Sequence, residues 1–131
     1  MSRLLKLLGA VSMSLGALAA CGGGNSDPTP YGAIAWDGGR PSAAIVVHFA
    51  SQPQANAAAI ERCGGDGCAV IHEFSGKGSC AALAVGGGSP LVTGVASGAS
   101  QGAAEAAAVE ACSAKGGRIC TIPNSLPGKC M

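Results

Sequence analysis

Aromatic and charged side chains are both scarce in this sequence of 131 residues. Aromatic residues make up 3% of the chain and charged residues 11%, and no apolar run reaches the roughly 18 residues that a membrane-spanning helix needs. A chain of this length forms one small domain, which is too small for a large catalytic fold. Because the few aromatic residues have no basic residues clustered around them, we expect no nucleic-acid partner.

The first twenty residues are organised like a bacterial export signal. Arg3 and Lys6 precede the uncharged and mostly apolar residues 7–20, and this order is typical of a signal peptide. As a helix, residues 7–20 would extend roughly 21 Å, which is less than the roughly 30 Å of a bilayer core. Without the signal, the chain keeps six basic and seven acidic residues, a formal charge of −1. Residues 17–19 also fit the A-x-A site of ordinary secretion.

The sequence LAAC at residues 18–21 resembles the lipobox of bacterial lipoprotein precursors. The resemblance implies cleavage before Cys21 and attachment of diacylglycerol to the Cys21 sulfur. One lipidated cysteine out of seven leaves six, an even number that an exported protein can pair. Two or three acyl chains hold a protein stably on a membrane, whereas one holds it only marginally.

This resemblance implies a cell-envelope lipoprotein that faces the periplasm, with the membrane as a partner through its N-terminal lipid. Gly22 follows Cys21 where inner-membrane retention favours Asp, which indicates the outer membrane rather than the inner one. The expected segments are a signal peptide at 1–20, the lipidated Cys21 with a flexible Gly/Pro tether at 21–30, and one domain at 31–131.

An internal repeat fills the expected domain. Residues 33–63 align without a gap to residues 82–112, and 15 of the 31 aligned positions are identical. The second copy then carries three extra residues before its next cysteine, so Cys120 corresponds to Cys68. Duplication of one supersecondary unit explains the pattern. The two units would span about 31–79 and 80–131.

Each unit has the pattern of a β-β-α-β element order. The fold class is therefore α+β, with about six strands and two Ala-rich helices. The first unit is expected to form strands at 32–36, 43–49 and 68–74 and a helix at 52–62. The second is expected to form strands at 81–85, 91–97 and 118–122 and a helix at 101–114.

Local signals fix some details of the first unit. Ile45, Val47 and Phe49 alternate along a strand and should share one face. Ser51 is placed to cap the helix that follows, with Gln54 three residues later completing a capping box.

Disulfides are expected because Ala-rich helices approach a sheet closely but bury little area, which leaves a thin core. Six cysteines allow fifteen pairings, and the repeat favours one of them. The expected pairs are Cys63 with Cys68, Cys112 with Cys120, and Cys80 with Cys130.

The order of these elements resembles a known family. The segment YGAIAW, an Ala-rich helix ending in Cys, a Cys-led strand, a Cys before an A-L-A-V strand and a second such helix resemble domain-of-unknown-function family 4189. The resemblance covers Tyr31 to Cys130. It implies a small exported bacterial protein with no assigned activity.

Metal or cation binding is the first of the chemical alternatives. Cys63, Cys68, His72 and Cys80 have spacings that suit a zinc site, but cysteines of an exported protein are expected to form disulfides instead. His48 and His72 lie on strands of one unit, and a pairing of His72 with Glu73 would suit a cation. Both histidines are more simply explained as the outward face of strands, so we expect no metal and no cofactor.

Catalytic alternatives are also weak. Residues 98–102 fit G-x-S-x-G around Ser100, between a strand and a helix as in a nucleophile elbow, but no histidine follows it, and a helix cap explains this serine better. Glu61 and Glu110 occupy equivalent positions of the two units, which favours a structural role. Trp36 is either an exposed contact residue or part of the core.

The sequence therefore predicts a non-catalytic binding module on the cell envelope, such as an inhibitor or immunity-type protein with a protein partner. Two alternatives are a small periplasmic hydrolase that uses Ser100 or a His48/His72 site, and a passive structural lipoprotein.

Overall fold

The computed structural model of the chain describes residues 28–131. The expected signal peptide, Cys21 and most of the expected tether lie outside these residues. Within residues 28–131, none of the helices has the length and apolar character needed to cross a membrane.

The first unit forms a three-stranded antiparallel sheet with one helix. Its elements are β1 (Tyr31–Asp37), β2 (Ser42–Phe49), α1 (Gln52–Cys63) and β3 (Ala69–Ser75). The strand order is β2-β1-β3, so α1 connects the two outer strands across the central one. The side chain of Ser51 accepts a hydrogen bond from the Gln54 backbone N–H, which confirms the expected N-cap.

The second unit repeats this arrangement with one added strand. Its elements are β4 (Cys80–Gly87), β5 (Val92–Gly98), α2 (Gln101–Ala114), β6 (Arg118–Thr121) and β7 (Lys129–Cys130). The strand order is β5-β4-β6, and β7 also pairs with β4. The expected α+β class with two helices is confirmed, and a seventh strand joins the six expected.

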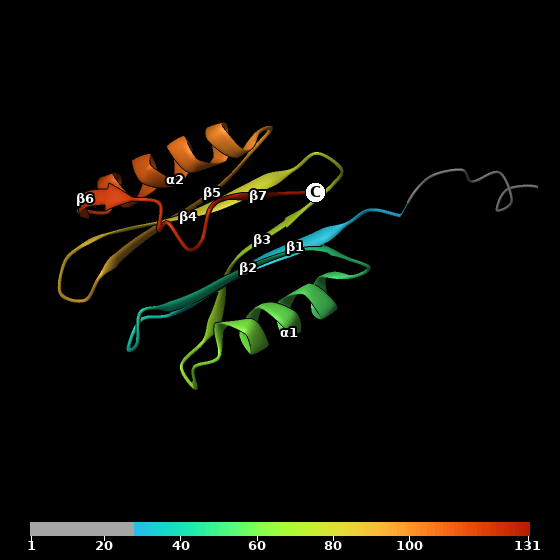
Figure 1. Cartoon of the computed structure of the whole chain (residues 1–131), viewed down its shortest axis with the longest axis horizontal. Helices are drawn as coiled ribbons and strands as arrows, with labels where there is room; N and C mark the ends of the chain where they lie inside the picture. The colour runs from blue at the N-terminus through green and yellow to red at the C-terminus, as the bar shows by residue number, and fades with distance from the viewer. Residues whose placement is uncertain (1–27) are drawn as a thin grey trace, which may run out of the picture.

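The two units stack to give four layers. In Figure 1 the helices α1 and α2 lie on opposite outer faces, and the two sheets lie between them. Between the two sheets, β3 contacts β5 and β2 contacts β7. An approximate two-fold axis that relates the two units produces such a reciprocal pair of contacts. The core between the sheets contains Ile34, Ile45, Phe74, Ala81 and Leu83.

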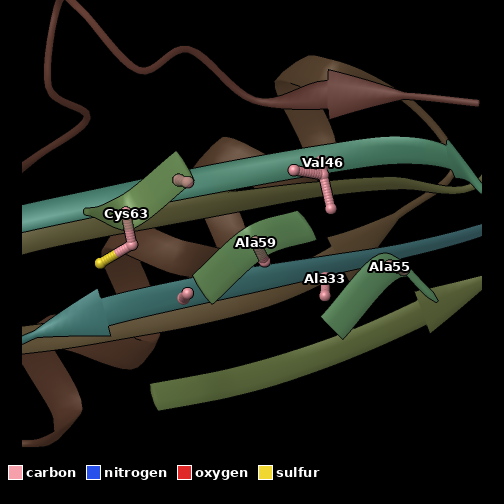
Figure 2. Packing of buried hydrophobic residues seen from close by; sticks show 7 residues of the cluster. Ala33, Val46, Ala55, Ala59 and Cys63 are labelled. Carbon is pink, nitrogen blue, oxygen red and sulfur yellow. The ribbon is translucent and has the colours of Figure 1, made fainter. Parts of the chain in front are cut away.

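Alanine dominates the contact between each helix and its sheet. Figure 2 shows Ala55 and Ala59 of α1 directed at Ala33 of β1 and Val46 of β2. In the second unit, Ala82, Ala84, Ala104 and Ala108 form the corresponding contact. These small side chains let the backbones approach closely, as the sequence predicted.

One expectation about β2 is wrong. Ile45 and Val47 face the core between the sheets, but Phe49 packs on the α1 side beside Tyr31. The pairing of β1 with β2 shifts by one residue between Ala33–Val46 and Tyr31–Phe49, and His48 in the extra position has a φ of 67°. This β-bulge sends the next side chain to the opposite face.

Three disulfides brace the domain. They join Cys63 to Cys68, Cys112 to Cys120, and Cys80 to Cys130, which are the pairs that the repeat favours. The first two link the end of each helix to the strand that follows. The third links β7 to the start of β4, where the two cysteines face each other in the ladder.

Candidate binding site

A hollow of about 290 Å³ lies between the two units. It is lined by Trp36, Pro41 and Ala43 of the first unit, Leu83 and Val85 of β4, and Pro123, Ser125 and Leu126 of the loop between β6 and β7. We call it the interunit pocket. Trp36 therefore serves as a wall of a hollow, a role that the sequence left open.

The interunit pocket lies where the two units differ. In the first unit, His72 of the unbroken strand β3 faces Ile34 of β1. In the second unit, Leu83 occupies the position of Ile34. On this side of β4, Val85 pairs with β6 and Ala81 pairs with β7, and Leu83 between them pairs with neither strand. The chain between β6 and β7 leaves the sheet edge here, which opens the space beside Leu83.

A glutamate of α2 holds the loop that borders the pocket. The Oε1 atom of Glu105 accepts hydrogen bonds from Gln101 Nε2 at 3.1 Å and from the Gly128 backbone N–H at 2.9 Å. Both bonds favour the ionised carboxylate, with the Gln101 bond the larger effect, and they lower the pKa of Glu105 below its usual value. No local sequence pattern predicts the contact of Glu105 with Gly128, because the two residues are far apart in the chain.

The pocket is suited to an uncharged ligand group. None of its lining residues is ionisable, and the indole of Trp36 and the prolines present rigid apolar walls. Its volume is at the lower end of the range for ligand sites.

Part of the pocket wall lies toward the end of the domain opposite to the start of β1. Figure 1 shows the chain entering β1 at one end of the sheets, with the C-terminus and the β3–β4 connection at that same end. The turn after β1, which carries Pro41, lies at the other end. Strand β1 spans seven residues, so roughly 20 Å separates its two ends.

A serine–histidine pair crosses the sheets elsewhere. The Nε2 atom of His72 in β3 lies 2.7 Å from the Oγ atom of Ser97 in β5, and the His72 ring stacks on Phe74 with 6.2 Å between ring centroids. Burial lowers the pKa of His72, which favours the neutral imidazole that can accept the Ser97 proton. Sequence reasoning missed Ser97, because no local motif marks a contact between two sheets.

The expected partners of His72 lie elsewhere. Glu73 points to the opposite face of β3, where its Oε2 atom accepts a hydrogen bond from Asn56 of α1 at 3.0 Å. His48 is separated from His72 by the central strand β1. The structure therefore brings neither the His48/His72 pair nor the His72/Glu73 pair together.

The other candidate residues have structural roles. Ser100 caps α2, because its side chain accepts a hydrogen bond from the Ala103 backbone N–H at 3.1 Å. Glu61 and Glu110 are exposed at equivalent helix positions. The three cysteines of the zinc alternative are held in disulfides, and residues 28–131 contain no group of three or more side chains placed to hold a metal ion.

A second hollow of about 340 Å³ surrounds the glycine-rich loop after α1. Here the Oδ1 atom of the buried Asp37 accepts hydrogen bonds from the backbone N–H groups of Gly39 at 2.9 Å and Arg40 at 3.3 Å. Asp66 and Arg40 lie on its wall. We call it the acidic loop site. Asp37 and Arg40 are the sequence neighbours of Trp36 and Pro41, but the Asp37 carboxylate faces the loop after α1, whereas Trp36 packs in the core between the sheets.

The fold and the pocket define a class of small α+β domain in which two duplicated units border an uncharged hollow. The chain belongs to the family described as Domain of unknown function (DUF4189), whose family model matches residues 31–126. That match spans both units and confirms the resemblance seen in the sequence. Searches of curated proteins and of solved structures found no match to the chain.

Proposed function

We propose that this protein is a lipid-anchored binding module of the cell envelope, which takes an apolar side chain of a protein partner into its interunit pocket. The observation that carries the proposal is the pocket itself, which has uncharged walls and is lined in part by the turn at the end of the sheets opposite to the start of β1. A domain tethered at its N-terminus would present this end to the periplasm.

The cysteine pattern supports lipidation. All six cysteines within residues 28–131 are in disulfides, so Cys21 is the one cysteine of the chain left for a lipid. Mass spectrometry of the mature protein without reduction tests this, because a diacylated Cys21 adds a defined mass to the N-terminal peptide. A mature chain that begins at another residue, or carries no lipid, would contradict the anchor.

The rigid walls of the pocket support an inhibitor or immunity-type role. A pocket that is already formed in the free protein loses little conformational entropy when a partner docks. The Glu105–Gly128 hydrogen bond holds the loop that borders the pocket. Such a module neutralises a partner by occupying its surface, with no chemical step.

Photo-crosslinking in cells tests the pocket. The full-length chain carries benzoylphenylalanine in place of Ser125, which lies exposed on the pocket wall. A matched chain carries it in place of Glu61, which is exposed on α1. We expect a discrete protein adduct from position 125 and none from position 61. No adduct from either position would favour the passive structural lipoprotein.

The hydrolase alternative now rests on Ser97 rather than on Ser100, because Ser97 is the serine that meets a histidine. A serine activated by a neutral histidine reacts with fluorophosphonates. Labelling that disappears in Ser97→Ala and persists in Ser100→Ala would favour this alternative. The absence of labelling in the wild-type chain would rule it out.

A further inference from the structure

A buried carboxylate faces the acidic loop site of the first unit. The side chain of Asp37 is only 6% exposed, and its hydrogen bonds from the backbone N–H groups of Gly39 and Arg40 both end on Oδ1. Among the residues that the structure describes, none donates a hydrogen bond to Oδ2, and no unpartnered side-chain oxygen is sealed inside the protein. The Oδ2 atom is therefore open to the hollow. Because a buried charge is costly unless it is paired, a donor that reaches Oδ2 would be bound favourably.

Glycine keeps this carboxylate accessible. The loop after α1 passes directly over Asp37, since a Cβ atom on Gly65 would collide with Oδ2 and one on Gly67 would lie 2.7 Å from Oδ1. A side chain at either position would displace or cover the carboxylate. The hollow in front of it has a volume of about 340 Å³, which lies within the range of small-molecule sites.

The second unit forms without this carboxylate. Gly86 stands at the position of Asp37, and Ser89 stands at that of Arg40. A Cβ atom on Gly86 would lie 2.5 Å from Cys120 Sγ and 2.8 Å from Cys112 Sγ, so the disulfide of the second unit fills this place. The same scaffold thus folds with glycine here, which indicates that the charged set of the first unit serves a purpose other than folding.

The charges of the acidic loop site define its ligand. The hollow is lined by two carboxylates, Asp37 and Asp66, and by the guanidinium of Arg40. A metal ion alone would be repelled by Arg40. A carboxylate binds an ammonium group through charge-assisted hydrogen bonds, and a guanidinium binds a carboxylate through two parallel ones. The set is therefore complemented by one molecule with two ammonium groups and one carboxylate.

We propose that the acidic loop site binds a free basic α-amino acid such as lysine. The α-ammonium group donates to Oδ2 of Asp37, Arg40 holds the carboxylate, and the side-chain ammonium group pairs with Asp66. This inference goes beyond the proposed function, because the acidic loop site shares no lining residue with the interunit pocket.

Calorimetric titration of the intact mature protein with three probes tests the ligand. L-lysine carries all three charged groups, L-norleucine lacks only the side-chain ammonium group, and cadaverine lacks only the carboxylate. We expect L-lysine to bind at least about tenfold more tightly than either analogue, because each analogue loses one charge-assisted pair. Equal binding of L-lysine and cadaverine, or of L-lysine and L-norleucine, would overturn the assignment of a basic α-amino acid.

Substitutions assign the roles of the side chains. Asp37→Asn keeps the oxygen that accepts the two backbone hydrogen bonds and replaces Oδ2 by a donor, so it should weaken L-lysine at least about tenfold. Glu61→Gln removes an exposed carboxylate of α1 and should leave binding unchanged. Arg40→Gln should weaken L-lysine about tenfold but not cadaverine, a difference that a purely structural role of Arg40 would not produce.

Amide NMR signals of the wild-type protein locate the ligand without any substitution. L-lysine should shift the signals of Gly39, Gly65 and Gly67 and leave those of α2 in place. No shift at about 10 mM L-lysine, which corresponds to very weak binding, would overturn the proposal, as would shifts confined to other residues. Shifts of the same signals by calcium chloride and not by L-lysine would overturn it in favour of a metal ion. The crosslinking from position 125 tests the interunit pocket separately, so the two proposals can fail independently.

Discussion

His72 and Ser97 form a side-chain hydrogen bond that joins the two units, since His72 belongs to β3 and Ser97 to β5. The ring also packs on Phe74 of the core between the sheets. Because the ring is half-buried, its charged form is poorly solvated in the folded protein. Protonation of His72 is therefore expected to weaken the packing of the two sheets against each other.

The first prediction concerns this pH dependence. Burial lowers the pKa of His72 in the folded state below its usual value of 6.5. The folded state therefore binds the proton less readily than the unfolded chain, and the stabilisation is complete above pH 6.5 and is lost as the pH falls below it. Thermal unfolding measured from pH 8 to pH 5 should show a falling Tm.

Two glutamine variants provide the control. His72→Gln keeps a hydrogen-bonding group without the charge and should flatten the decline in Tm. His48→Gln, at an exposed histidine, should leave the slope of the decline unchanged. A slope that follows His48 and not His72 would contradict the assignment.

The second prediction concerns Ile119 of β6, whose side chain is 90% exposed and whose φ of 50° strains a β-branched residue. Asparagine tolerates positive φ far better than a β-branched residue does. Ile119→Asn should therefore raise the free energy of unfolding by about 1 kcal/mol, because it removes strain and loses no buried area. Chemical denaturation checks this, with Ile71→Asn as control. Ile71 is much less exposed than Ile119 and does not have a positive φ, so its replacement should destabilise the fold.

At the scale of elements, the close approach of α2 to β5 depends on Gly94. A Cβ atom added to Gly94 would lie 2.2 Å from the Ala108 carbonyl oxygen and 2.2 Å from the Cys112 backbone nitrogen. Backbone atoms on both sides leave no flexible group that can move aside. The helix is thus seated on this strand because the strand has no side chain there.

The third prediction follows from that contact. Gly94→Ala should lower the free energy of unfolding by at least 1–3 kcal/mol, roughly the cost of overpacking a core. Gly102→Ala, made in α2 where an added Cβ meets nothing within 4 Å, should instead stabilise the fold by up to about 1 kcal/mol through helix propensity. Denaturant unfolding of both variants checks the contrast, and equal effects would contradict it.

The sequence predicts most elements of the fold because their signals are local. Serine at the helix starts, glycine and proline in the turns and the repeat of 31 positions are all read within short windows. The disulfide pairs follow from the same repeat, since corresponding cysteines stand in the same relation to corresponding helices.

The sequence does not reveal the register of β2 against β1. The turn after β1 is one residue shorter than the turn after β4, and β2 contains one extra residue, so the alignment of the two units shows no gap. Residues 38–41 connect Asp37 to its pair Ser42, whereas residues 87–91 connect Gly86 to Val92, one residue more. The first unit recovers that residue in the bulge at His48. The gap-free alignment therefore hides a one-residue shift, and the extra residue reverses the alternation that predicts Phe49 on the face of Ile45 and Val47.

The candidate site is harder still to predict, because it belongs to neither unit alone. The pocket depends on how the sheets stack and on the departure of the chain from the sheet between Thr121 and Lys129. Strand β7 has only two residues, too few to give a periodic signal. The contact of Ser97 with His72 likewise depends on the stacking of the sheets.

At the scale of the whole molecule, the two units are similar at their helices and different at their edges. The helix contacts are built from alanine in both, and each helix is linked by a disulfide to the strand that follows. The edge strand is continuous in the first unit and interrupted in the second. Duplication thus supplies the scaffold, and the departure from symmetry supplies the pocket.

The last prediction compares the disulfides across that scaffold. Cys80–Cys130 closes a separation of 50 residues and Cys63–Cys68 one of 5. The entropy that a disulfide removes from the unfolded chain grows with the loop it closes, so the losses on replacement by alanine should be about 4 kcal/mol for the long loop and about 2 kcal/mol for the short one. Denaturant unfolding of the two double-alanine variants measures both.

The position of the long disulfide adds a second consequence to this comparison. Cys130 pairs with Cys80 directly after the loop that borders the interunit pocket, whereas Cys63–Cys68 lies on the other unit. Loss of Cys80–Cys130 should therefore weaken the crosslinking from position 125 at temperatures where the domain is still folded, and loss of Cys63–Cys68 should not. If both variants lost the adduct equally, the pocket would depend on overall stability rather than on the Cys80–Cys130 disulfide between β4 and β7.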